Sequence, residues 1–74
     1  MLIDGAFYTL PDGTRVQLTI PLTVGNVWRL STLDGQPQYL RDHGRWYSLR
    51  YNARTDAYAA APCDLVDADL SPVE

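Results

Sequence analysis

The two residue types best suited to nucleophilic or acid–base catalysis each occur once, as His43 and Cys63. A cysteine nucleophile needs a base beside it, and His43 belongs to a different predicted turn, about twenty residues away. His43 precedes Gly44, where a histidine fits as a turn residue because it tolerates left-handed backbone conformation. We therefore predict no catalytic residue and expect that the protein is not an enzyme.

Acidic residues gather near the C-terminus, where their carboxylates suggest calcium or magnesium ligands. Asp64, Asp67, Asp69 and Glu74 lack the alternating spacing and the central glycine of a calcium-binding loop. One cysteine and one histidine are too few for a zinc module. We predict no metal and no cofactor, and we interpret residues 63–74 as an acidic C-terminal tail.

Aromatic and arginine side chains point to recognition instead. Residues 38–42 and 45–51 form a predicted hairpin around His43-Gly44, which sets Arg41 opposite Trp46 at a distance suited to a cation–π contact. Exposed tryptophan, tyrosine and arginine are enriched at binding hot spots. The face that carries both residues is therefore the candidate binding surface, and its members are Tyr39, Arg41, Trp46 and Arg50, together with Ser48.

The opposite face of this hairpin is the predicted core face. Strand alternation places Leu40, Tyr47 and Leu49 on it, and the next turn adds Tyr51 opposite Tyr58. The sequence leaves one alternative open, in which both faces are covered and Trp46 lies buried under the N-terminal strand against Phe7. The binding-surface hypothesis requires that Trp46 is at least partly exposed.

Charge limits the classes of partner. Six Arg and no Lys stand against eight Asp and one Glu, which gives a net charge of −3. An acidic chain is a poor ligand for a phosphate backbone, which needs clustered cations. Nucleic acid remains an alternative partner, because Arg41, Arg45, Arg50 and Arg54 lie close together along the chain and aromatic side chains can stack bases. An acidic inhibitor that mimics nucleic acid is a further alternative.

The chain shows no apolar run near the length of a membrane span and no signal-peptide pattern at its start. The single cysteine offers no intramolecular disulfide. We therefore expect a cytoplasmic protein without a membrane partner.

Turn signals recur at the spacing typical of all-β domains. We predict strands over residues 6–10, 15–20, 27–33, 38–42, 45–51 and 57–60, with a connection over residues 22–26. Leu10-Pro11-Asp12-Gly13 is a turn whose glycine takes the left-handed position. This first hairpin sets Tyr8 opposite Val16 and predicts a core face made of Ala6, Tyr8, Leu10, Val16, Leu18 and Ile20.

Two segments resemble parts of WW domains. Gly44-Arg45-Trp46-Tyr47 is similar to their central hairpin, and Leu10-Pro11-Asp12-Gly13 is similar to their opening Leu-Pro-x-Gly. Thirty residues separate Gly13 from Gly44, which is too many for a WW domain. We attribute the similarity to common hairpin turns and assign the sequence to no family.

The sequence thus predicts an all-β fold, a five- to six-stranded antiparallel meander arranged as an SH3-like or OB-like barrel or a curved sheet. Residues 1–62 form one β domain, and residues 63–74 form a tail that contains either a helical turn capped by Asp64 or a last strand ending at Ser71-Pro72. The expected function is non-enzymatic binding of a protein or peptide, through the aromatic and arginine face or through a sheet edge. An open edge strand also offers a route to a homodimer.

Overall fold

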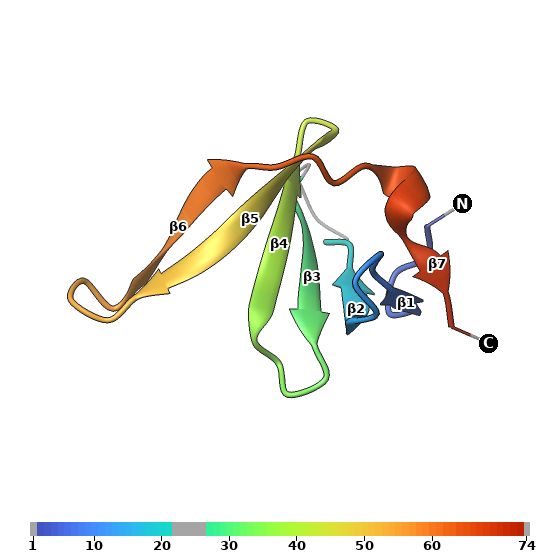
Figure 1. The fold of residues 1–74 in the computed structure, drawn as a ribbon, viewed down its shortest axis with the longest axis horizontal. Coiled ribbons are helices and arrows are strands. Elements are labelled where there is room, and N and C mark those ends of the chain that lie inside the picture. Colours follow the sequence, from blue (N-terminus) through green and yellow to red (C-terminus); the bar gives the residue numbers. More distant parts are fainter. Residues whose placement is uncertain (1, 22–26, 74) are drawn as a thin grey trace.

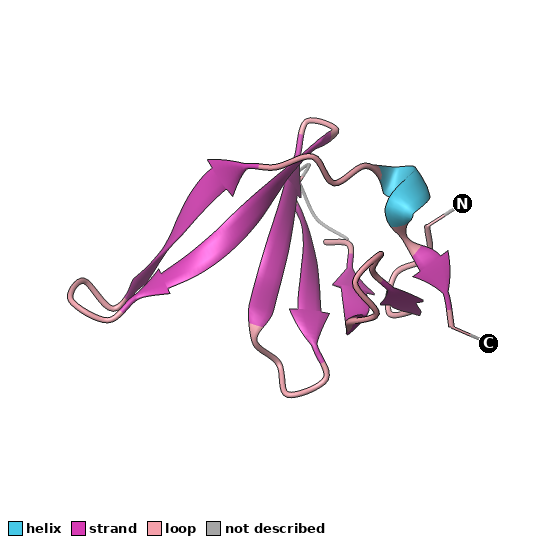
Figure 2. Cartoon of the chain, in the orientation of Figure 1, coloured by secondary structure: helices cyan, strands magenta, loops and turns pink. Residues whose placement is uncertain are grey.

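A computed structural model describes residues 2–21 and 27–73, which form a single seven-stranded antiparallel sheet (Figures 1 and 2). The predicted all-β class is confirmed. The predicted connection over residues 22–26 lies outside the described residues. In chain order the strands are β1 (Phe7–Thr9), β2 (Arg15–Thr19), β3 (Trp28–Thr32), β4 (Pro37–Asp42), β5 (Arg45–Asn52), β6 (Ala57–Pro62) and β7 (Ser71–Pro72).

The first six strands follow one another as a meander, and the last strand returns to the beginning. The order across the sheet is β6-β5-β4-β3-β2-β1-β7, so β7 lies beside β1 and β6 ends the opposite edge. Between β6 and β7 the chain forms one short 3-10 turn, η1 (Asp67–Asp69). Both alternatives predicted for the tail therefore occur, one after the other. The turn begins after Val66 rather than after Asp64, and the Asp69 carboxylate accepts the Val66 N–H.

The first hairpin has the predicted register. Tyr8 lies opposite Val16, and the Leu10 N–H donates to the carbonyl of Thr14. Gly13 adopts a φ of +91°, which is the left-handed position that the turn requires. The Asp12 carboxylate accepts the Thr14 N–H at 2.9 Å, and this bond lowers the pKa of Asp12.

The second hairpin also has the predicted register. Arg41 pairs with Trp46 and Asp42 pairs with Arg45, so His43 and Gly44 form the two-residue turn. Both turn residues have positive φ, +49° and +81°, as a two-residue turn of the type I′ class requires. The next register is confirmed as well, because Tyr51 lies opposite Tyr58.

The core lies on one face of the sheet and is closed by the C-terminal segment. Leu18, Leu30 and Val16 are fully buried at its centre. The predicted core face of the first hairpin is confirmed, and Leu70 from the segment after η1 packs onto it, so residues 63–74 belong to the same packed unit. The buried residues are Tyr8, Leu10, Val16, Leu18, Leu30, Trp46 and Leu70, with Ala6 and Ile20 packed beside them.

The predicted core face of the second hairpin is wrong. Tyr51 and Tyr58 are exposed, whereas Trp46 from the opposite face is buried. The reason is the neighbour in the sheet, because Leu30 of β3 lies opposite Tyr39 of β4, and this pair joins the Tyr39 and Trp46 face to the core.

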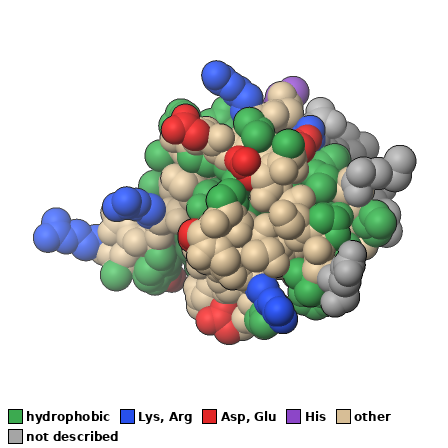
Figure 3. Space-filling view, turned by 45° about the vertical axis from the view of Figure 1, so that its right-hand side comes forward, with side chains coloured by type: hydrophobic (Ala, Val, Ile, Leu, Met, Phe, Trp, Pro, Cys, Tyr) green, Lys and Arg blue, Asp and Glu red, His purple; other side chains and the backbone are tan. Residues whose placement is uncertain are grey.

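The β5–β6 hairpin extends beyond the rest of the sheet. β4 pairs with β5 only over Arg45–Ser48, whereas β6 pairs with β5 over Tyr47–Asn52. Residues 49–60 are therefore a two-stranded ribbon, which we call the arm. It projects from the body in the ribbon view and on the left of the space-filling view (Figures 1 and 3).

Candidate functional site

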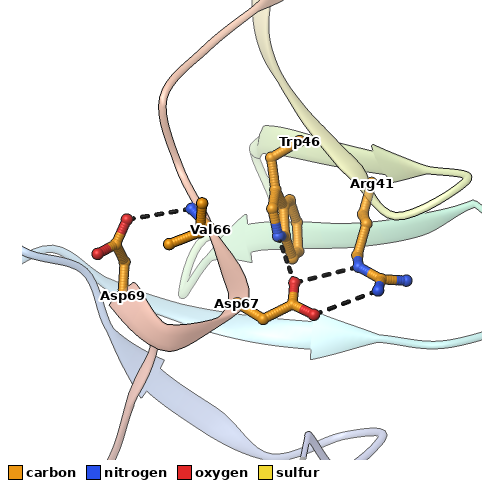
Figure 4. Close-up of polar contacts among 5 residues, drawn as sticks. All are labelled: Arg41, Trp46, Val66, Asp67 and Asp69. Atoms are coloured by element: carbon orange, nitrogen blue, oxygen red, sulfur yellow. Dashed lines mark hydrogen bonds and ion pairs between the residues drawn. The ribbon is translucent and has the colours of Figure 1, made fainter.

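Two side chains of the β4–β5 hairpin, Arg41 and Trp46, meet the side chain of Asp67 from η1 (Figure 4). The Asp67 carboxylate accepts the indole N–H of Trp46 at 2.7 Å. The same carboxylate accepts hydrogen bonds from Nε of Arg41 at 3.1 Å and from Nη2 at 3.2 Å, so the guanidinium binds it through two parallel bonds. We call these three residues the latch, because they connect the C-terminal segment to β4 and β5.

A fourth residue completes the environment of the latch. The guanidinium carbon of Arg41 lies 4.0 Å from the centroid of the Trp28 ring. The predicted cation–π contact of Arg41 is thus made with a tryptophan of β3 rather than with Trp46 across the hairpin. This difference arises because the indole of Trp46 turns its N–H toward Asp67, and β3 brings Trp28 opposite Arg41 on the other side.

The residues of the predicted binding surface do not form one common exposed surface. Trp46 is 3% exposed, so the expectation of a partly exposed tryptophan is wrong. Tyr39 packs against the core, and Arg41 is held by Asp67. Arg50 alone lies on the exposed arm. The alternative in which Trp46 is buried holds, but the C-terminal segment covers it rather than Phe7, whose own side chain is exposed.

The latch has the chemistry of a structural contact. Within the described residues no buried side-chain nitrogen or oxygen lacks a hydrogen-bond partner. The Trp46 N–H, which would otherwise be an unpaired buried donor, is satisfied by Asp67. The sequence placed Asp67 in an acidic tail and predicted no contact of its carboxylate with Trp46 or Arg41. The available signal was its position between Leu65 and Leu70, two apolar residues that both reach the core.

The arm is a surface that this packing leaves open. Every residue of β6 is exposed, and the last residues of β5 are exposed as well. Tyr51 is 55% exposed and Tyr58 is 43% exposed, although both carry large aromatic rings. The arm therefore presents aromatic surface to solvent on a hairpin that no third strand of the described chain supports.

The two tyrosines of the arm form a contact pair. Their ring centroids lie 5.4 Å apart with an interplanar angle of 58°. The Tyr51 hydroxyl donates to Asp56, and this bond, followed by partial desolvation and the nearby Tyr58, raises the pKa of Tyr51. The Tyr58 hydroxyl donates a hydrogen bond to Oε1 of Gln36 at 3.2 Å, which connects the arm to the β3–β4 turn. Both hydroxyls are thus engaged within the chain, while the rings remain accessible.

The two edges of the sheet differ in their protection. β7 is only two residues long and ends in Pro72, which has no N–H to offer a further strand. β6 is six residues long and carries no charged side chain, no bulge and a single proline at its end. Natural proteins commonly block exposed edges with charges, bulges or prolines. β6 therefore has the features of an edge that accepts another strand.

The other parts of the described chain supply little chemistry. Across residues 2–21 and 27–73 no group of three His, Cys, Asp or Glu side chains is placed to hold a metal ion. His43 Nδ1 lies 2.6 Å from the Asp42 carboxylate at an exposed turn. No helix in the described part is long and apolar enough to cross a membrane. Comparisons with family models, with curated proteins and with solved structures find no match for the chain.

Proposed function

We propose that this protein is a protein-binding module that receives an extended segment of its partner along the arm. The observation that carries the proposal is the arm itself, a two-stranded ribbon with exposed aromatic side chains. An isolated two-stranded hairpin is marginally stable in water and gains stability from a third strand or from packing. A partner strand paired with β6 supplies both of these missing contacts.

The chemistry of β6 favours a polypeptide over a nucleic acid. The strand offers a row of backbone N–H and C=O groups and carries no cation. Of the arginines proposed to follow phosphates, Arg41 is already neutralised by Asp67. The chain as a whole has a net charge of −3, which opposes binding to a phosphate backbone.

A pair of photo-crosslinking variants tests this proposal. The photoreactive residue p-benzoylphenylalanine is placed either at Tyr58 on the arm or at Phe7 on β1. Both positions carry an aromatic side chain that is 43% exposed, so they are matched for reach into solvent. Each variant is irradiated in lysate of its own source, and covalent adducts are analysed by mass spectrometry with and without nuclease treatment.

The expected result is a protein adduct at position 58 that survives nuclease and is at least several-fold stronger than any adduct at position 7. An adduct that disappears with nuclease contradicts the proposal in favour of nucleic acid. Equal labelling at the two positions also contradicts it, because the arm is then no more of a binding surface than β1. Circular dichroism of both variants confirms that they retain the β fold.

A further inference from the structure

We infer that the arm binds a second copy of this chain, with β6 of each copy pairing antiparallel to the other across a two-fold axis at Ala59. This inference rests on the proposed function and names the partner. The pairing joins the two sheets edge to edge and turns each arm into a four-stranded ribbon. Three features of the chain support this pairing: the register that β6 permits, the charges at its ends and the surface area that the chain leaves exposed.

The side-chain alternation of β6 restricts the register. Antiparallel pairing about a two-fold axis keeps the same face of both sheets on the same side, so a residue must lie opposite one of the same face. With Ala59 on the axis, Tyr58 lies opposite Ala60 of the second copy, and Ala57 lies opposite Ala61 of the second copy. Each large ring thus lies beside a small side chain, and Pro62, which has no N–H, stays outside the paired segment.

The charges that flank β6 are compatible with the same register. The turn before the strand carries the exposed Arg54, and the segment after it carries the exposed Asp64. With Ala59 on the axis, the antiparallel arrangement brings the turn that carries Arg54 in each copy toward Asp64 of the other copy. Shifting the axis to Ala60 sets Asp56 opposite Asp64, which places like charges together. The strand itself is uncharged, and at physiological salt the repulsion between two chains of net charge −3 is screened within about 8 Å.

The chain is more open than a compact monomer of its size. The chain exposes 5412 Å², whereas a compact monomer of its mass exposes about 4,600 Å². The excess is about 800 Å², so the chain leaves more surface exposed than a compact monomer of its mass. The radius of gyration, 12.1 Å, also exceeds the value of about 11.3 Å expected for this length. The arm contributes to this open shape, because every residue of β6 is exposed.

Charge substitution at the axis tests the pairing. Sedimentation velocity of the wild-type chain over micromolar to sub-millimolar concentrations is expected to show a reversible monomer–dimer equilibrium. Ala59→Glu places two carboxylates side by side across the axis and is expected to weaken the dimer at least about tenfold. Ala59→Lys is expected to do the same, and an equimolar mixture of the two variants restores dimer. This rescue cannot come from misfolding of either variant.

A cysteine at the axis tests the register. In a Cys63→Ser background, Ala59→Cys brings two thiols directly opposite each other, at Cα separations of about 4.5–5.5 Å, which a disulfide can span. Ala57→Cys is the matched control, because its two copies lie about 13 Å apart along the strands in this register. Mild oxidation is expected to crosslink the Ala59→Cys variant and to leave the Ala57→Cys variant monomeric on non-reducing gels.

The outcomes separate this inference from the proposed function. A wild-type chain that stays monomeric at all concentrations overturns the dimer, and so does equal crosslinking at positions 57 and 59. If a foreign protein is then photo-crosslinked at position 58, the binding function of the arm stands with another partner. If the adduct at position 58 has twice the mass of the chain and contains only its peptides, the dimer is supported.

Discussion

Replacing Asp67 with alanine is the sharpest test of how the C-terminal segment is held. The change removes the acceptor of the Trp46 N–H, a donor that is then buried without a partner. It also removes the carboxylate that pairs with Arg41. We therefore expect the variant to be destabilised while the sheet itself remains able to form.

The magnitude follows from the burial of each contact. Leaving a buried donor unpaired costs about 1–3 kcal/mol. The ion pair is partly solvated, since the side chains of Arg41 and Asp67 are 19% and 47% exposed, and its loss adds at most about 1 kcal/mol. The sum is about 1–4 kcal/mol, which lowers the Tm of a domain of this size by roughly 5–30 °C.

Urea and thermal unfolding followed by circular dichroism measure this loss against a matched control. Asp64→Ala makes the same change of charge and size at an exposed position nearby, and it is expected to stay within about 0.5 kcal/mol of the wild type. Asp67→Asn retains an acceptor for the indole and should cost less than Asp67→Ala. Trp46→Phe removes the donor itself, so the effects of Trp46→Phe and Asp67→Ala should not add. If Asp67→Ala is as stable as Asp64→Ala, the latch does not hold the segment and this reasoning fails.

Three further predictions concern single turns. Asp56→Asn should lower the pKa of Tyr51 toward its ordinary value, because the hydrogen bond to Asp56 is the main cause of the increase. That bond stabilises the fold below about pH 10, and its effect is lost as the pH rises through the folded-state pKa of Tyr51. A tyrosine titration near 295 nm that is unchanged in the variant refutes this assignment. Gly13→Ala should cost about 1–2 kcal/mol in urea unfolding, because φ at this position is +91° and an L side chain is strained there, so a wild-type midpoint contradicts the strain. The hydrogen bond from the Thr32 hydroxyl lowers the pKa of Asp34, so its stabilising effect is present above about pH 4 and disappears as the pH falls through the folded-state pKa. Asp34→Asn should therefore reduce Tm more at pH 7 than in strong acid, and an equal reduction in both conditions contradicts this role of the hydrogen bond.

The hairpins were predictable from the sequence because their determinants are local. Pro11 and Gly13 define the first turn, and His43 with Gly44 defines the second, since each turn type demands particular backbone angles at particular positions. Once a turn is fixed, the pairing of both strands follows from counting. The registers of Tyr8 with Val16 and of Arg41 with Trp46 were obtained in this way and are confirmed.

The candidate site was not predictable in the same way. Both faces of the second hairpin carry aromatic side chains, so alternation identified the two faces but not which of them is covered. The choice depends on β3, which joins Leu30 to the Tyr39 side, and on the C-terminal segment, which closes over Trp46. The same packing explains why the predicted binding surface is divided and why the arm replaces it as the candidate.

The sequence by itself thus determined the all-β class, most strands and the registers of the β1–β2, β4–β5 and β5–β6 hairpins, because these depend on turn chemistry and on the alternation of side chains. The tertiary structure alone decided that Asp67 belongs to a latch, that Trp46 is buried and that the arm is exposed. These features depend on contacts between segments far apart in the chain, such as the pairing of β7 with β1, which no local pattern encodes. Burial is a property of the neighbours that a face acquires, whereas periodicity reports only that a face exists.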